Sequence, residues 1–273
     1  MSYKSILVNI DIDGPVTPLI KLAADLARQF GARVIGCSAA DIVPPMVTME
    51  GMVVDGEMLE RQRGDIEARL EHLRGKFAGL VGDGVETEWR SDVMNPTRLL
   101  VRSARMADLI VTGAPEGARA GSAYRATDLG DLLLHAGRPV LVSAAGAEHL
   151  LARKALVAWK DGREARRAVS DAVPFLSRAT EVVVATVDPD GSRQSRDSVA
   201  DVVAFLGRHG IKARGEILPG RDEGARLAEF AAGLHADLVV SGAYGHSRLR
   251  EWVLGGVTRS LLDDVRLNRL MSA

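Results

Sequence analysis

The sequence predicts an α/β protein made of two doubly wound, five-stranded, mainly parallel sheets in tandem. Three observations lead to this fold class. Short runs that are apolar throughout alternate with longer segments of helical periodicity, which is typical of parallel sheets covered by helices on both faces. The same pattern occurs twice along the 273 residues. Hydrophobic residues make up 47% of the chain, which is enough for a buried core.

The repeat is clearest in two aspartate-led runs. The segments ARMADLIVTGAP (104–115) and GLHADLVVSGAY (233–244) match at a constant offset of 129 residues. The runs SILVNI (5–10) and KALVAW (154–159) open the two halves at a different offset, so the first half carries extra residues, which we place at 41–57. We therefore expect one domain at 1–145 and a second at 151–273, joined by small, turn-prone residues.

The elements of the second half follow from its apolar runs and their spacing. Between the first two strands, apolar residues recur at helical spacing from Ala165 to Leu176, and Pro174 is expected to bend or interrupt that helix. In the first half, residues 57–80 predict a long amphipathic helix with a charged outer face. The strands expected in the second half are 155–159, 181–187, 213–218, 237–241 and a weaker terminal strand in LNRLMS.

The final strand of each half is an edge strand in this plan. PVLVSA (139–144) and LNRLMSA (267–273) would each expose unpaired backbone groups. We expect these two strands to pair, so that the two domains associate within one chain. Whether two chains then form a homodimer stays open.

Composition excludes several function classes. The formal net charge of −1 offers no field that would recruit nucleic acid or an anionic membrane. Cys37 is the single cysteine, so no intrachain disulfide forms and a reducing, cytoplasmic location is expected. The six histidines show no metal-ligand spacing, and no signal peptide or membrane-spanning run is evident, so we expect no metal site and no membrane partner.

Glycines gather after the last strong strand of the second half, in GAYGHSRLREWVLGGVTRSLL (242–262). The pattern is neither a Walker A loop nor the dinucleotide-binding GxGxxG. Gly242 and Gly245 allow the loop amides to face inward as an anion-binding nest. Gly255 and Gly256 precede a helix expected at 256–264, whose free amides and positive dipole end favour phosphate. Thr258 adds a hydroxyl group in the first turn of that helix.

This stretch resembles the nucleotide-binding signature of the universal stress proteins, in which the glycines are spaced G-x2-G-x9-G before a small hydroxyl residue. The resemblance covers the chain twice and implies a tandem member with a Rossmann-like fold that binds ATP or another adenine nucleotide, with or without Mg²⁺. It places the phosphates on the loop and the adenine between the first two strand ends. Two positions depart: Gly256 replaces the family's Ser or Thr, and Lys160 stands where an aspartate is usual, with Asp161 next. The implied nucleotide contacts are Ala158, Lys160, Val187, Ser241, Gly242, Gly245, His246, Gly255, Gly256, Val257 and Thr258.

The first half carries a degenerate copy of this loop. Gly113 is kept, but Glu116, Ala126 and Thr127 occupy the other glycine positions. Glu116 places a carboxylate at the position where Gly245 leaves the backbone amides of the second half uncovered, and this negative charge would repel a phosphate. We therefore expect one nucleotide per chain, held by the second half.

Three functions remain open at this point. The leading one is a cytoplasmic stress-response protein that holds the nucleotide as a regulatory ligand, without catalysis. A slow ATPase or autophosphorylating protein needs a general base, and the spacing of residues assigns none, so no catalytic residue is named. A nucleotide-free interaction scaffold is the third, since Gly256 and Lys160 depart from the nucleotide-binding pattern.

Overall fold

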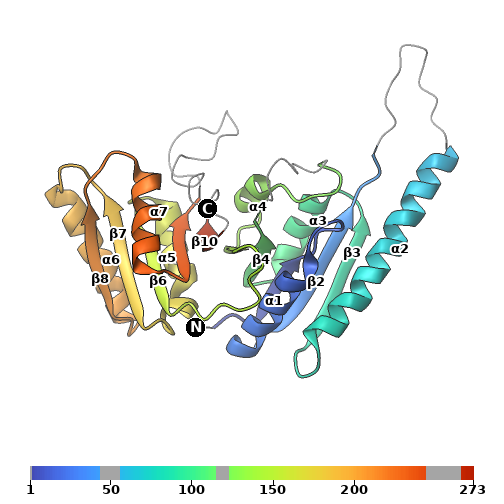
Figure 1. The fold of residues 1–273 in the computed structure, drawn as a ribbon, viewed down its shortest axis with the longest axis horizontal. Helices are drawn as coiled ribbons and strands as arrows, with labels where there is room; N and C mark the ends of the chain where they lie inside the picture. Colours follow the sequence, from blue (N-terminus) through green and yellow to red (C-terminus); the bar gives the residue numbers. More distant parts are fainter. Residues whose placement is uncertain (1, 44–55, 115–122, 244–265) are drawn as a thin grey trace, which may run out of the picture.

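The computed structural model describes residues 2–43, 56–114, 123–243 and 266–273, and its helices and strands alternate along both halves (Figure 1). In chain order, the elements of the first half are β1 (Ser5–Asn9), α1 (Val16–Phe30), β2 (Arg33–Ala40), α2 (Gly56–Val81), β3 (Thr87–Val93), α3 (Pro96–Ser103), the 3₁₀ turn η1 (Ala104–Met106), β4 (Leu109–Gly113), α4 (Leu129–His135) and β5 (Val140–Ser143). Those of the second half are β6 (Lys154–Ala158), α5 (Arg163–Leu176), β7 (Glu181–Val187), α6 (Arg193–Arg208), β8 (Ala213–Leu218), α7 (Glu223–Leu234), β9 (Leu238–Gly242) and β10 (Asn268–Ser272).

The strands form one sheet in the order β3-β2-β1-β4-β5-β10-β9-β6-β7-β8. Each half contributes five strands with its first strand in the middle, and the two halves mirror each other across the centre. All neighbours are parallel except β5 and β10, which run antiparallel with Leu141 opposite Leu270. The predicted α/β class with mainly parallel, doubly wound strands is confirmed, and the two five-stranded units are continuous at their final strands.

The repeated Ala-Asp pair has a structural role at the start of the fourth strand of each half. Asp108 accepts hydrogen bonds from the backbone amides of Lys4 (2.7 Å) and Ser5 (3.0 Å), which begin β1. Asp237 accepts hydrogen bonds from the amides of Arg153 (2.7 Å) and Lys154 (3.2 Å), which begin β6. In each half, one carboxylate therefore fixes the start of the first strand against the fourth.

The central strands are buried on both faces, as their apolar sequences predict. On α5, all of the residues expected to face the sheet are buried: Ala165, Ala168, Val169, Ala172, Val173 and Leu176. Pro174 does not interrupt this helix, which continues to Leu176. Its ring lies in the last turn, where only one hydrogen bond to a preceding carbonyl is lost before the helix ends.

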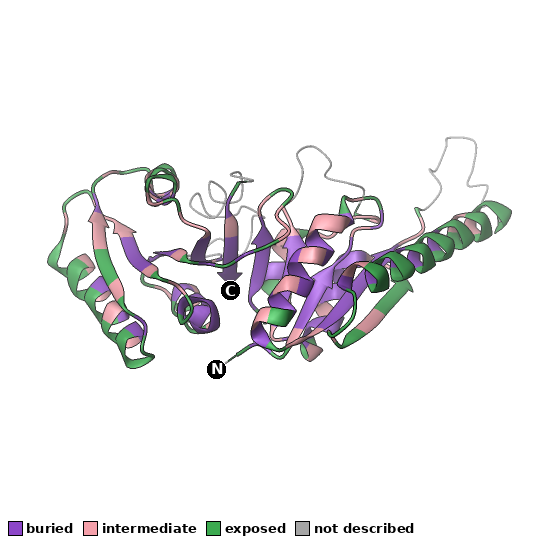
Figure 2. Cartoon of the chain, turned by 60° about the horizontal axis from the view of Figure 1, so that its bottom comes forward, coloured by how far each residue is buried: buried purple, intermediate pink, exposed green. Residues whose placement is uncertain are grey.

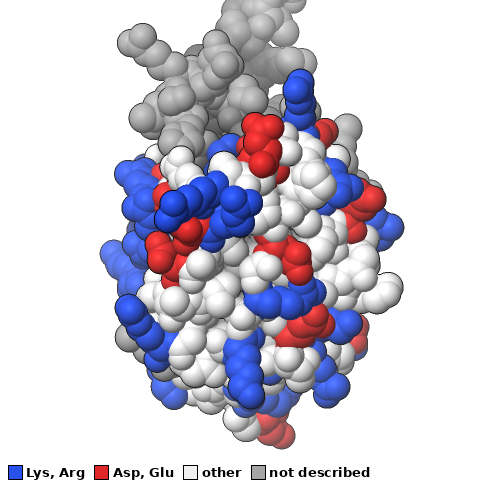
Figure 3. Space-filling view, turned by 90° about the vertical axis from the view of Figure 1, so that its left-hand side faces the viewer, with Lys and Arg blue, Asp and Glu red and all other residues white. Residues whose placement is uncertain are grey.

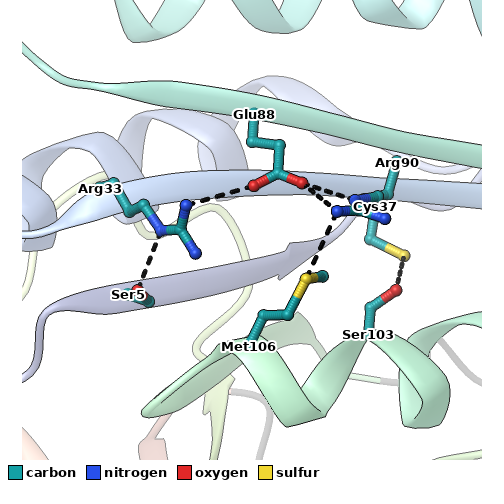
Figure 4. A network of polar contacts seen from close by, with 7 residues as sticks. All are labelled: Ser5, Arg33, Cys37, Glu88, Arg90, Ser103 and Met106. Carbon is teal, nitrogen blue, oxygen red and sulfur yellow. Dashed lines mark hydrogen bonds and ion pairs between the residues drawn. The ribbon is translucent and has the colours of Figure 1, made fainter.

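The outer strands β3 and β8 are polar and partly exposed, as expected for sheet edges. On β3, Glu88 accepts hydrogen bonds from Arg33 (3.3 Å) and Arg90 (2.6 Å), and both arginines remain partly solvent-exposed (Figure 4). Such surface pairs contribute little to stability.

Cys37 of β2 lies close to these side chains. Burial raises the pKa of its thiol to about 12, so the sulfur stays protonated at neutral pH.

The long helix α2 is amphipathic, with Ile66, Leu70, Leu73, Phe77 and Val81 buried. All of these residues lie in its second part. Its first ten residues are mostly exposed and extend beyond the rest of the half (Figure 2).

An aromatic cluster joins the helical faces of the two halves. The rings of Tyr3 and Phe30 from the first half contact Phe175 of α5 at centroid distances of 5.5 and 5.1 Å. The Tyr3 hydroxyl donates a hydrogen bond to the backbone carbonyl of Asp171 (2.5 Å), and Arg178 donates to that of Gln29 (2.6 Å). Contact between the halves therefore includes a packed apolar layer in addition to the strand pairing.

The Phe175→Ala substitution tests this layer. Phe175 is 2% exposed, so its removal should lower the free energy of unfolding by about 3–5 kcal/mol, because a large side chain leaves a cavity. Urea unfolding measures the change. The control Leu134→Ala, at a position that is 44% exposed, should change stability by no more than about 0.5 kcal/mol. Equal losses in the two variants would contradict the interface described.

Candidate functional site at the carboxyl ends of the strands

The second half has a topological switch point between β6 and β9. These neighbours are parallel, and the chain leaves β6 through α5 to reach β7 on the other side. In doubly wound sheets, ligands bind beyond the carboxyl ends of the strands at such a point. The described strands of the predicted site, β6, β7 and β9, meet at this switch point.

The structure brings several predicted site residues together there. Ala158 and Ser241 are register partners at the ends of β6 and β9, and Val187 ends β7, the other neighbour of β6. Ala158 and Val187 belong to the apolar cluster that includes Leu227 of α7. The predicted contacts Gly245, His246, Gly255, Gly256, Val257 and Thr258 lie outside the described residues.

Among the predicted contacts that the structure describes, Ser241 is the one with an unsatisfied buried polar atom. The residue is 5% exposed, and its Oγ has no hydrogen-bond partner among the described residues, a condition shared by Ser38 on β2. Buried hydroxyls are nearly always hydrogen-bonded, so an orphaned one invites an explanation. Ser241 differs from Ser38 in lying on β9, one of the two strands that form the switch point of the second half.

In the first half, the hydroxyl group at the position equivalent to Ser241 has a hydrogen-bond partner. Thr112 stands at the position of Ser241 in the aspartate-led repeat, and Asn9 stands at that of Ala158. Asn9 donates a hydrogen bond to Thr112 Oγ1 (3.1 Å), and both side chains are buried. Replacement of the asparagine by Ala158 removes this donor, which accounts for the unpaired Ser241 hydroxyl.

More polar groups close the strand ends of the first half. Asn9 also donates to Asp11 (3.3 Å) and accepts a hydrogen bond from Thr127 Oγ1 (3.2 Å). Burial raises the pKa of the Asp11 carboxyl, while hydrogen bonds from Asn9 and from the backbone of Thr127 act in the opposite direction. Close by, Arg125 binds both carboxylate oxygens of Asp13 (2.6 and 3.1 Å), and this contact lowers the pKa of Asp13.

Apart from Thr127, sequence reasoning did not single out this network. Two features of the sequence could have indicated it. Asn9 and Asp11 are polar residues at the end of an otherwise apolar strand, and Thr112 is a polar residue within the aspartate-led repeat. The described polar groups at these strand ends satisfy one another through hydrogen bonds. Glu116, the carboxylate expected to repel phosphate, lies outside the described residues.

Lys160 follows the end of β6 and forms an ion pair with Glu223 (2.9 Å), in the first turn of α7. The lysine side chain is 60% exposed, so the pair is weakly held and the ammonium group can exchange partners. The neighbouring Asp161 is paired with Arg166 (2.7 Å). A lysine thus occupies the place at which the first half has Asp11, and the charge beside the strand end is reversed.

Gly242 has a packing role that the sequence did not reveal. A Cβ at this position would lie 2.7 Å from the backbone nitrogen of Ala165 and 2.9 Å from the carbonyl carbon of Glu164. Both atoms belong to the first turn of α5, whose N-cap Gly162 makes no side-chain capping hydrogen bond. Glycine is therefore required here for close approach of helix and strand, independently of any ligand.

On the face at the β8 end of the sheet, basic and acidic side chains are interspersed (Figure 3). Among the described residues, no three His, Cys, Asp or Glu side chains gather as a metal site. No helix in the described part of the chain is both long and apolar enough to cross a bilayer.

Known structures share this architecture over more than nine-tenths of their own length. A universal stress protein from Archaeoglobus fulgidus DSM 4304 superimposes with a TM-score of 0.72, covering 98% of this chain and 97% of its own, at 14% identity. The chain has the fold of a tandem universal stress protein. A functionally unknown protein from Pseudomonas aeruginosa PAO1 matches with a TM-score of 0.58 and 16% identity, over 99% of this chain and 92% of its own. Neither a protein-family profile nor a curated protein sequence matches.

The universal stress protein resemblance seen in the glycine loop is thus confirmed at the level of the fold. Identities of 14–16% leave ligand and activity to be argued from the residues of this chain.

The packing role of Gly242 can be tested against the equivalent position of the first half. Gly242→Ala should lower the free energy of unfolding by about 1–3 kcal/mol, because the methyl group meets backbone atoms that must shift. Gly113→Ala is the matched control: a Cβ there meets nothing within 4 Å, so the change should stay within about 0.5 kcal/mol. Denaturation midpoints in urea compare the two. If both variants lose equal stability, the close approach of α5 to β9 is not the cause.

Proposed function

We propose that this chain is a cytoplasmic stress-response protein whose second half binds ATP or a related adenine nucleotide as a regulatory ligand. The unpaired hydroxyl of Ser241 at the switch point is the observation that carries the proposal. In the first half, the equivalent hydroxyl bonds to Asn9, whereas Ala158 leaves the Ser241 hydroxyl without this partner. The glycine spacing after Gly242 supports the same site from the sequence.

Each described residue has a defined task in this proposal. Ala158 and Val187 offer small apolar surfaces at neighbouring strand ends, against which a flat base packs. Ser241 donates or accepts a hydrogen bond on the same side. Lys160 leaves Glu223 and pairs with an anionic group of the ligand, since its exposed ion pair costs little to break.

The phosphates lie, in this proposal, against Gly245, His246 and the helix start that the sequence predicts at Gly255, Gly256, Val257 and Thr258. Free backbone amides at a helix start bind phosphate oxygens without any basic side chain. Mg²⁺, when present, would neutralise further phosphate charge. The bound ligand shifts a conformation or a choice of partner, and no chemical step is needed.

Calorimetric titration with ATP tests the site. The wild-type chain should bind one nucleotide. Gly245→Glu copies the first-half residue into the second half and should weaken binding by about 1–3 kcal/mol, through lost amide contacts and like-charge repulsion. Glu116→Gly is the reciprocal control and should leave the stoichiometry at one, because the first-half strand ends remain filled by their own side chains.

Two binding sites per chain, or unchanged affinity in Gly245→Glu, would overturn the assignment. Mass analysis of nucleotide released on denaturing the purified protein identifies the ligand. Absence of both released and titratable nucleotide would favour the scaffold function. Phosphate release from ATP above that of a Gly255 variant would favour the slow ATPase.

A further inference from the structure

A groove of about 860 Å³ lies between α5 and α6 in the second half. Its volume falls within the range of small-molecule sites in proteins. The apolar cluster at the strand ends packs against α7, whereas this groove is bounded by the other pair of helices. It is therefore distinct from the proposed nucleotide site.

The groove follows from the position of α5. In the first half, α1 packs over β1, β2 and β4 and also against α2. In the second half, α5 packs chiefly over β9 and β10, which the close approach at Gly242 permits, while α6 packs over β8 and β7. Displacement of α5 towards the centre of the molecule leaves space between the two helices.

The floor of the groove is aromatic and aliphatic. It is formed by Trp159, Val169, Val202 and Phe205, of which all but Phe205 are at least nine-tenths buried. The indole Nε1 of Trp159 donates a hydrogen bond to Ser198 Oγ (2.9 Å), which fixes the orientation of the ring. In the first half, the smaller Ile10 stands at the position of Trp159. The second half therefore has an indole of fixed orientation at a position where the first half has an aliphatic side chain.

The rim of the groove carries an excess of one negative charge. Asp161 is paired with Arg166 (2.7 Å) and Arg193 with Asp197 (3.5 Å), so these four charges balance. Asp201 of α6 also lines the groove, and no ion pair or hydrogen bond to its carboxylate is found among the described residues. A ligand that fills the groove thus meets an apolar floor and one uncompensated carboxylate.

We propose that this groove binds a small aromatic amine. The aromatic body packs on Trp159 between Val169 and Val202, and the ammonium group pairs with Asp201. A neutral apolar molecule would satisfy the floor but leave the carboxylate without a partner, and an anion would be repelled by it. Cation–π attraction to the indole ring adds to the preference for a positive charge.

Calorimetry with 2-naphthylmethylamine as the probe tests the proposal on the full chain, with 2-naphthylacetate as the matched anion. The amine should bind and the acetate should bind more weakly. Asp201→Asn should weaken amine binding about fivefold, the upper range for a partly exposed ion pair, and reduce the difference between the two probes. Asp65→Asn, which removes an exposed carboxylate on α2, is the control. It should change neither the affinity for the amine nor the difference between the two probes.

Ser170→Trp provides an independent block. Ser170 is exposed on α5 and lines the groove, so an indole there fills the space without entering the core. Binding of the amine should fall at least about tenfold, with an unchanged unfolding midpoint. The proposal is overturned if the amine does not bind up to its solubility limit, if the acetate binds equally well, or if neither variant affects binding.

Discussion

The antiparallel pairing of β5 with β10 is the interaction on which the rest of the structure depends. It converts two five-stranded sheets into one sheet and removes two edges that would otherwise expose unpaired backbone groups. Asn268 reinforces the junction, because its side chain accepts a hydrogen bond from the Ala144 amide (2.9 Å) and donates one to the Asp237 carbonyl (3.1 Å). Pairing also holds α5 beside the first half, where Phe175 completes the aromatic cluster.

The two halves share a plan but differ at their strand ends. In the first half, Asn9, Asp11, Thr112 and Thr127 satisfy one another and fill the switch point. In the second half, Ala158 removes the partner of Ser241 and Lys160 reverses a charge. The duplicated fold therefore has a hydrogen-bonded polar network at the strand ends of one half and an unpaired hydroxyl at those of the other.

Much of the fold could be predicted from the sequence because it depends on local pattern. The inner second-half strands β6, β7 and β9 contain continuous apolar runs, and every residue expected on the buried face of α5 is buried. The first-half polar network escaped prediction because it joins Asn9 to Thr112 and Thr127, residues more than 100 positions apart. The glycine pattern located the candidate site, but the packing role of Gly242 depends on the placement of α5, which no local signal encodes. The groove beside Trp159 also depends on the placement of α5, so the sequence did not indicate it.

The central claim is that an adenine nucleotide binds at the switch point of the second half. Photolabelling of the full chain with 8-azido-ATP, followed by peptide mapping, tests it most directly. The account predicts a single light-dependent adduct on peptides from the ends of β6, β7 or β9, and loss of that adduct when ATP is added as competitor. An adduct on the strand ends of the first half, or labelling that ATP does not reduce, would contradict it.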